Sequence, residues 1–169
     1  MRTSWIRCIL VGLLVSMRLD AQDTSHVALV FGLHGPGVLV PVSSKTAVRL
    51  DAAVSKSSSG GLDTWNESVG MSALFYLQRW DALRTFVGPR VSYSHSKFGG
   101  GPATSTTWSG QGLFGTEYTL ARRFGVFGEV GLSYARTTGT RVTVTNQAIP
   151  LAPNTQWSTT SGVGLLFRF

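Results

Sequence analysis

The chain has 169 residues and a formal net charge of +7, from 15 Lys and Arg against 8 Asp and Glu. Its cations are scattered rather than clustered, which argues against a nucleic-acid-binding protein. The only cysteine, Cys8, excludes a disulfide framework. No run of about 18 apolar residues occurs, which excludes a helical membrane span.

The first 21 residues are predicted to be a cleaved signal peptide. Arg2 and Arg7 precede the apolar run ILVGLLVSM, and Ala21 is a small residue after which a signal peptidase can cut. This run has about half the length that a helical membrane anchor needs. Residues 22–169 are therefore expected to form the mature protein, as one domain without cysteine.

Short alternating runs of β-branched and aromatic residues predict strands throughout the mature chain. Residues 25–42 are expected to form two strands of seven or eight residues folded about His34–Gly37, with an unusual hairpin or one kinked strand as alternatives. Six further strands are predicted to start near Thr46, Glu67, Leu83, Thr107, Phe124 and Thr159. The total is even, as a membrane barrel requires when both chain ends lie on one side.

Short and long connections are predicted to alternate along the chain. The short ones lie at residues 42–45, 79–81 and 121–123, and the long ones at 55–66, 96–107 and 137–156. Such alternation is typical of a barrel with short turns on one side of a membrane and long loops on the other. The segment TRVTVTN at 140–146 is expected to prolong a strand, whose exposed edge could take up a partner strand.

Period-two alternation gives each predicted strand an apolar and a polar face. Aromatic residues on the apolar face indicate which face is outside. One predicted ring consists of Trp65, Tyr93, Trp108, Tyr134 and Trp157. A second ring, at the opposite ends of the strands, consists of Phe75, Leu83, Tyr118, Phe124, Phe167 and Phe169.

Two aromatic rings that bracket an apolar band are what a lipid-facing barrel requires. A soluble lipocalin-like barrel would instead turn its apolar face inward. We therefore predict an all-β fold, an eight-stranded antiparallel up-and-down transmembrane β-barrel. Its interior is expected to be polar and filled by its own side chains, with structural charge pairs rather than a substrate-binding cluster. The predicted interior residues are Arg49, Asp51, Arg90, Gln111, Glu117 and Glu129.

The segments FVGPRVSYS, FGVFGEVGLSY and GVGLLFRF resemble the small outer-membrane β-barrel domain family, which includes opacity-type adhesins and the barrels of outer membrane proteins X and A. The resemblance covers the mature chain and implies location in the bacterial outer membrane. The alternate apolar residues Val163, Leu165, Phe167 and Phe169 resemble the C-terminal signal of such chains. They imply the barrel insertion machinery as a partner.

Candidate sites for chemistry are few. His26, His34 and His95 are too far apart in sequence to suggest a metal site. His95 stands beside Ser94 and Ser96, and some eight-stranded barrels are lipid A deacylases that use His, Ser and an acid. Alternation turns both serines away from His95, which argues against that activity. The stretch at 99–102, GGGP, is expected to be a surface loop, because no Lys-Ser or Lys-Thr pair follows it.

The predicted function is that of a non-enzymatic outer-membrane barrel that supports the envelope or makes surface contacts. Its expected partners are outer-membrane lipid and lipopolysaccharide, the insertion machinery and an extracellular partner at the loops, with no cofactor, no metal and no nucleic acid. One alternative is a binding or transport barrel for a small apolar ligand that enters laterally. Another is a lipid A-modifying enzyme.

Overall fold

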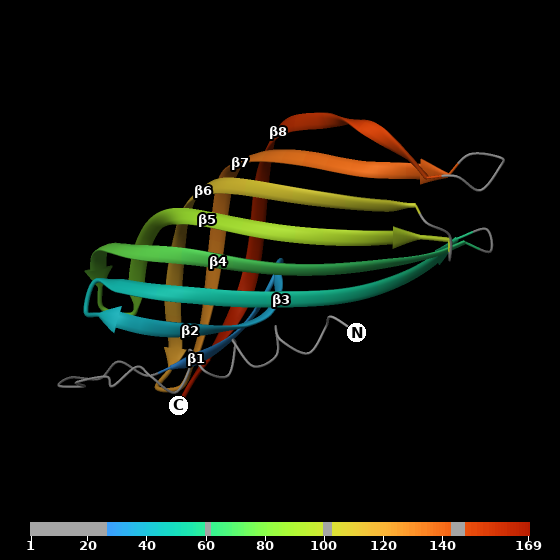
Figure 1. The fold of residues 1–169 in the computed structure, drawn as a ribbon. Helices are drawn as coiled ribbons and strands as arrows, with labels where there is room; N and C mark the ends of the chain where they lie inside the picture. The colour runs from blue at the N-terminus through green and yellow to red at the C-terminus, as the bar shows by residue number, and fades with distance from the viewer. Residues whose placement is uncertain (1–26, 60–61, 100–102, 143–147) are drawn as a thin grey trace.

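The computed structural model describes residues 27–59, 62–99, 103–142 and 148–169 (Figure 1). The predicted signal peptide and His26 lie outside these residues. The described chain forms one closed antiparallel barrel in which sequence neighbours pair and β1 also pairs with β8. The strands are β1 (Ala28–Gly32), β2 (Gly35–Ser43), β3 (Thr46–Ser59), β4 (Leu62–Trp80), β5 (Leu83–Phe98), β6 (Thr104–Ala121), β7 (Phe124–Val142) and β8 (Ala148–Arg168).

This architecture confirms the predicted all-β, eight-stranded, up-and-down barrel. None of the described residues belongs to a helix that is long and apolar enough to cross a membrane. The three short turns lie where the sequence placed them, between β2 and β3, β4 and β5, and β6 and β7.

The first hairpin consists of two strands, as predicted, and not of one kinked strand. They differ in length, however, with 5 residues in β1 and 9 in β2. The turn lies at Leu33–His34 rather than across His34–Gly37, because Pro36 and Gly37 already pair with Phe31 and Val30. Gly35 has a φ of 95°, a conformation that L side chains rarely adopt and that suits glycine at this turn.

The predicted long connections are wrong in extent, because most of their residues belong to strands. β4 begins at Leu62 instead of near Glu67, β6 at Thr104 instead of near Thr107, and β8 at Ala148 instead of near Thr159. The Ser- and Thr-rich segments pair antiparallel, Ser58 with Asp63 for example, so the hairpins continue far beyond the apolar part of the barrel. β7 extends to Val142, which confirms part of the predicted strand extension, while residues 143–146 lie outside the described residues.

The pairing register defines how strongly the strands tilt. Register partners trace one row of inward-facing residues through the eight strands: Ala28, Leu39, Arg49, Ser72, Arg90, Gln111, Ser133 and Ser158. Ala28 pairs on its other side with Arg168, ten residues from Ser158 along β8. This stagger tilts the strands relative to the barrel axis, typically by about 35–45°.

Candidate functional site

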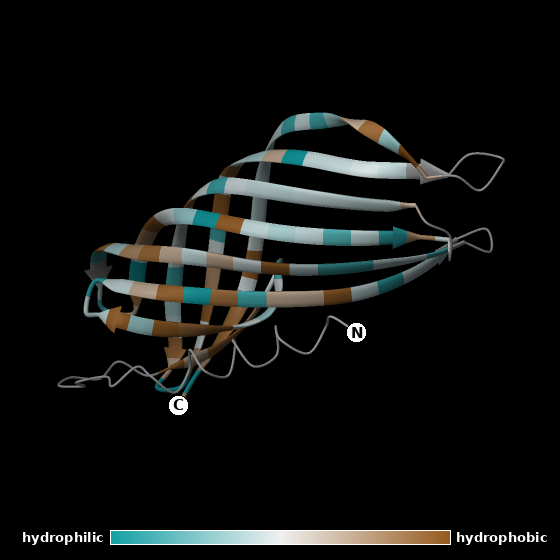
Figure 2. Ribbon diagram, viewed as in Figure 1, coloured by the Kyte–Doolittle hydropathy of each residue, from teal (hydrophilic) through white to brown (hydrophobic). Residues whose placement is uncertain are grey.

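The outer wall of the barrel is apolar over one half of its length. In β8, the outward-facing Val163 is 80% exposed, whereas Leu166, on the inward face of the same strand, is 3% exposed. Leu165, Phe167 and Phe169 are exposed as well, so all four residues of the predicted C-terminal signal lie on the outside. Figure 2 shows hydrophobic residues concentrated toward the end that holds the C-terminus and paler or hydrophilic ones toward the far ends of the long strands.

Exposed aromatic residues border this apolar band at both ends. All eleven residues of the two predicted rings are on the outward face, and Tyr93 packs on Trp108 and Tyr134 on Trp157 at centroid distances of 4.8 and 5.1 Å. Ten residues separate the two rings on each of five strands, in the pairs Trp65 and Phe75, Leu83 and Tyr93, Trp108 and Tyr118, Phe124 and Tyr134, and Trp157 and Phe167.

Ten strand residues extend about 33 Å, which the tilt reduces to an axial height of about 25 Å. An outward apolar band about 25 Å tall is the dimension found in outer-membrane barrels. The sequence reasoning missed Trp80, which is also exposed, next to the turn between β4 and β5.

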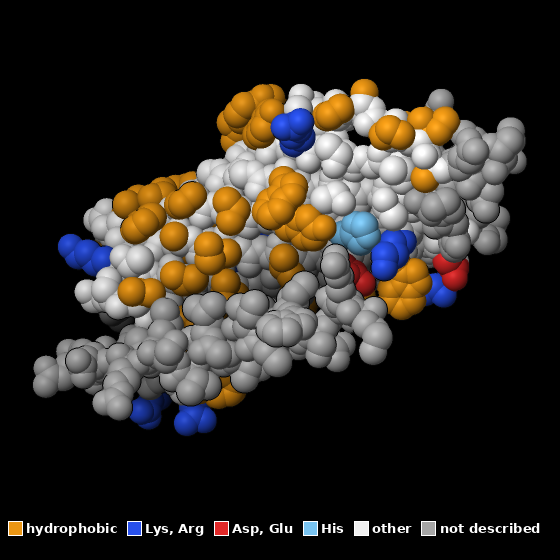
Figure 3. Space-filling view, in the orientation of Figure 1, with side chains coloured by type: hydrophobic (Ala, Val, Ile, Leu, Met, Phe, Trp, Pro, Cys, Tyr) orange, Lys and Arg blue, Asp and Glu red, His pale blue; other side chains and the backbone are white. Residues whose placement is uncertain are grey.

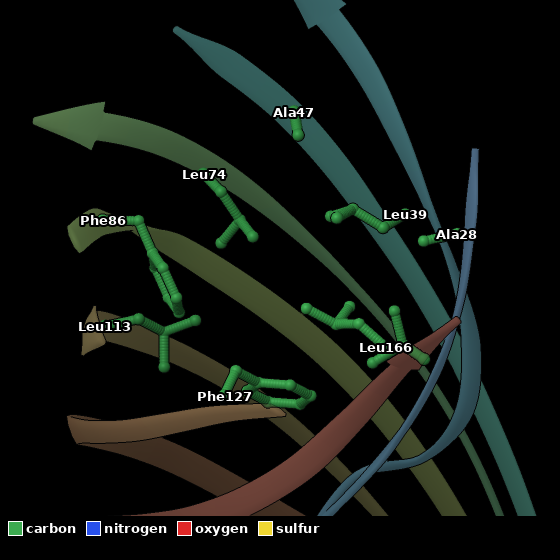
Figure 4. Close-up of a cluster of buried hydrophobic side chains, with 9 residues drawn as sticks. Ala28, Leu39, Ala47, Leu74, Phe86, Leu113, Phe127 and Leu166 are labelled. Atoms are coloured by element: carbon green, nitrogen blue, oxygen red, sulfur yellow. The ribbon is translucent and has the colours of Figure 1, made fainter. Parts of the chain in front are cut away.

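The interior toward this end also contains an apolar cluster, which the prediction of a polar interior did not include. Leu74, Phe86, Leu113, Phe127 and Leu166 point toward one another from different strands (Figure 4). Gly164 leaves room for Phe127, because a Cβ there would lie 2.3 Å from the ring. The space that remains among these side chains is about 10 Å³, at the limit for one water molecule. The lumen is therefore closed at this level.

The predicted interior charges form pairs rather than one network. Arg90 donates to both carboxylate oxygens of Asp51 at 2.5 and 2.6 Å, and to Ser72 at 3.3 Å. Arg49 donates to both oxygens of Glu129 at 2.8 and 3.2 Å. His34, in the turn of the first hairpin, lies 3.5 Å from Glu129. The two arginines and two carboxylates are buried, His34 is only partly buried, and each carboxylate has a basic partner, as desolvated charges require.

Glu117 belongs to a third cluster, nearer the C-terminal end of the barrel. It accepts hydrogen bonds from Arg84 at 2.7 Å, from Tyr76 at 3.3 Å and from Arg168. Arg84 and Arg168 were not among the predicted interior residues, although strand alternation turns both inward. Gln111 is in none of the charged clusters and donates a hydrogen bond to Thr160.

Above the charged pairs, toward the loops, the inner wall consists of small polar side chains. Ser92 and Ser109 share a hydrogen bond of 2.6 Å, Thr107 and Thr137 one of 2.8 Å. These residues are only partly buried. The interior therefore changes along the barrel from the apolar cluster and the Glu117 cluster at the C-terminal end, through the paired charges, to neutral hydroxyl-bearing side chains.

Figure 3 shows acidic and basic side chains together at the far ends of the strands, further Lys and Arg side chains at the end that holds the C-terminus, and many hydrophobic side chains on the wall between. Lys56 donates to Asp63 at 2.8 Å and lies 5.8 Å from the centre of the Trp65 ring. Ser58 also donates a hydrogen bond to Asp63. The hydrogen bond from Lys56, and then that from Ser58, lower the pKa of Asp63 below its usual 3.8.

Replacing Lys56 with glutamine is expected to raise the pKa of Asp63 toward 3.8, and Ser58→Ala to raise it less. Because the pKa of the folded state is lowered, the stabilisation from this pair is present above pH 3.8 and is lost as the pH falls through the folded-state pKa. Carboxyl ¹³C NMR titration measures the shift. Lys97→Gln is the control, because Lys97 is the register partner of Trp65 on β5, the opposite side from Lys56. An unchanged pKa of Asp63 in Lys56→Gln would contradict the prediction.

His95 lies on the outer wall, and its Nδ1 is 3.2 Å from the Thr106 hydroxyl on β6. Ser94 and Ser96 lie on the opposite face of β5, as predicted. Glu67 of β4 is the register partner of His95, and the sequence reasoning overlooked this acid. No ion pair joins Glu67 to His95 among those of the described residues, and these residues contain no group of three metal-ligand types.

No protein-family model matches the chain, and no curated protein matches it. Among solved structures it is similar to the crystal structure of Acinetobacter baumannii CarO, with 13% identity, a TM-score of 0.41, and coverage of 87% of this chain and 98% of that one. This chain is also similar to the crystal structure of Acinetobacter baumannii CarO2, with 12% identity, a TM-score of 0.40, and coverage of 86% of this chain and 98% of that one.

Proposed function

We propose that this chain is a non-enzymatic barrel of the bacterial outer membrane that supports the envelope or makes surface contacts through its long hairpins. The observation that carries the proposal is the outward apolar band, bordered by aromatic rings ten residues apart on five strands. A soluble barrel would have no reason to expose such a band to water.

In this proposal the short turns and the C-terminus face the periplasm, and β3 to β8 extend beyond the membrane on the cell surface. Residues 1–21 serve as the signal peptide, and Val163, Leu165, Phe167 and Phe169 as the signal for the insertion machinery. Lipopolysaccharide surrounds the upper ring, and a partner on the cell surface meets the hairpin ends. Their Ser- and Thr-rich strands are solvated and suited to such contacts.

The closed interior counts against a transport barrel. A small ligand that crossed the barrel would have to displace the cluster of Leu74, Phe86 and Phe127, which leaves space for about one water molecule. Passage is therefore not part of the proposal.

A lipid A-modifying enzyme is the remaining alternative, and His95 tests it. We expect His95→Ala to leave the acyl-chain composition of lipid A unchanged, because Glu67 does not form an ion pair with His95 and the interior acids face the lumen. Mass spectrometry of lipid A from strains with the wild-type protein, the variant and no protein measures this. A change shared by the variant and the deletion strain would contradict the non-enzymatic proposal.

The test of location is expression of the full chain in a Gram-negative host, followed by isolation of outer membranes and electrophoresis with and without boiling. The proposal expects a band in that fraction whose mobility changes on heating, since folded barrels resist detergent. It also expects an N-terminus near Gln22. A soluble periplasmic product without a mobility shift would overturn it.

A further inference from the structure

The β1–β2 hairpin closes only part of the barrel wall. β1 pairs with β8 no further than Phe31 with Leu165, and β2 pairs with β3 no further than Gly37 with Asp51. The hairpin turn still lies against Ala53 of β3 and Gly162 of β8, so beyond it the described residues Val54–Ser59 and Ala148–Ser161 have a strand partner on one side only. Figure 1 shows β1 and β2 confined to one end while the other strands continue.

The two open edges are separated by the width of the two hairpin strands. Three strand spacings of about 4.8 Å make this gap about 14 Å wide at the hairpin tip. The tip reaches Gly162, where an added Cβ would lie 2.8 Å from Leu33. We call this opening the β3–β8 gap.

The β3–β8 gap reaches below the upper aromatic ring. Trp157 marks that ring on β8, so Ser158–Ser161 lie at hydrocarbon depth, and on β3 the residues below Lys56, the partner of Trp65, do so too. Open sheet edges do not face lipid at this depth, because their backbone N–H and C=O groups need polar partners. Polar material must therefore fill the gap.

The inward side chains beside the gap are small, polar and uncharged. Ser158 and Thr160 line it from β8, and Thr160 accepts a hydrogen bond from Gln111. The charged groups beneath are already matched, Asp51 with Arg90 and Glu129 with Arg49. His34, in the hairpin turn that bounds the gap, lies 3.5 Å from Glu129 and belongs to that matched group. This lining suits hydroxyl groups better than a net charge.

We propose that the β3–β8 gap is a lateral binding site for an amphiphile of the outer leaflet, with an uncharged sugar head group in the polar interior and acyl chains in the lipid. Sugar hydroxyls both donate and accept hydrogen bonds, as the two strand edges and the serine and threonine side chains require. Because the apolar cluster closes the barrel below, the ligand is held rather than passed through. This inference rests on the proposed membrane location and adds a ligand to it.

The test uses the barrel in phosphatidylcholine nanodiscs and a dodecyl maltoside with a photoactivatable diazirine on its sugar. We expect labelling at residues 54–55 of β3 and 158–161 of β8. Unlabelled dodecyl maltoside should compete, and dodecylphosphocholine, which has the same chain length but a zwitterionic head group without sugar hydroxyls, should not. Labelling spread around the outer wall, labelling of neither edge, or equal competition by the two detergents would overturn the inference.

Thr160→Val is expected to reduce labelling about fivefold, the ratio for loss of one hydrogen bond. Ser94→Ala is the matched control, because Ser94 faces inward from β5, across the barrel from the gap, and should leave labelling unchanged. Equal labelling of both variants would contradict the inference. The change of gel mobility on heating distinguishes failure of the ligand inference from failure of the proposed function. A barrel that inserts but is not labelled would overturn only the ligand inference. A chain that does not insert would overturn the proposed function itself.

Discussion

Replacing Asp51 with alanine is expected to destabilise the barrel by about 3–5 kcal/mol, because it leaves the buried guanidinium of Arg90 without its counter-ion. Arg90 is 5% exposed and Asp51 8% exposed, so water does not reach the pair freely. Arg90 also donates a hydrogen bond to the Ser72 hydroxyl, but a hydroxyl cannot neutralise a cation. Urea unfolding of the protein folded into lipid vesicles, followed by tryptophan fluorescence, measures the loss.

The double variant Asp51→Leu with Arg90→Met is expected to recover most of that stability, since apolar residues of similar volume often replace a buried ion pair without loss. Asp63→Ala is the control for removing an acid, because the Lys56–Asp63 pair is exposed and solvent screens it. A loss in Asp51→Ala no larger than in Asp63→Ala would contradict the proposed role of the buried pair.

The faces of the barrel could be predicted because each strand residue has only two directions to point. The alternation that put Phe167 outside and Leu166 inside follows from the pleat alone. Strand ends were harder to predict. Segments such as Ser55–Ser59, near and beyond the upper ring, are polar on both faces, so they lack the hydrophobic alternation that marks a strand and resemble loops.

Partners inside the lumen could not be predicted from the sequence. Arg49 and Glu129 are 80 residues apart and meet because the register carries β3 and β7 to facing positions across the barrel. The alternation in the sequence predicts that both residues face inward. It does not predict the offset of ten residues on closing the barrel, which brings the two side chains to the same height. The apolar cluster was not predicted for a related reason: alternation turns Phe86 and Phe127 inward, but their convergence depends on that same offset.

The membrane assignment predicts opposite behaviour for two equally exposed positions on the outer wall. Val130 is 53% exposed and lies on β7 between the two rings, whereas Leu120 is 55% exposed and lies on β6 beyond Tyr118 of the lower ring. Val130→Arg is expected to destabilise the folded barrel in lipid vesicles by about 2–4 kcal/mol, because a cation near the bilayer centre loses its hydration. Leu120→Arg, at the interface, should lose only about 0–1 kcal/mol.

Urea titration of the two variants in the same vesicles gives the comparison, with wild-type protein as reference. Exposure to solvent does not distinguish the two sites, so in a water-soluble barrel both substitutions would be close to neutral. A difference in the free energy of unfolding between the two variants therefore reports depth in the hydrocarbon rather than burial in the protein. If Val130→Arg proved as stable as Leu120→Arg, the apolar band would not face lipid. Its exposure would then need another partner, because an apolar surface of this size is not left open to water.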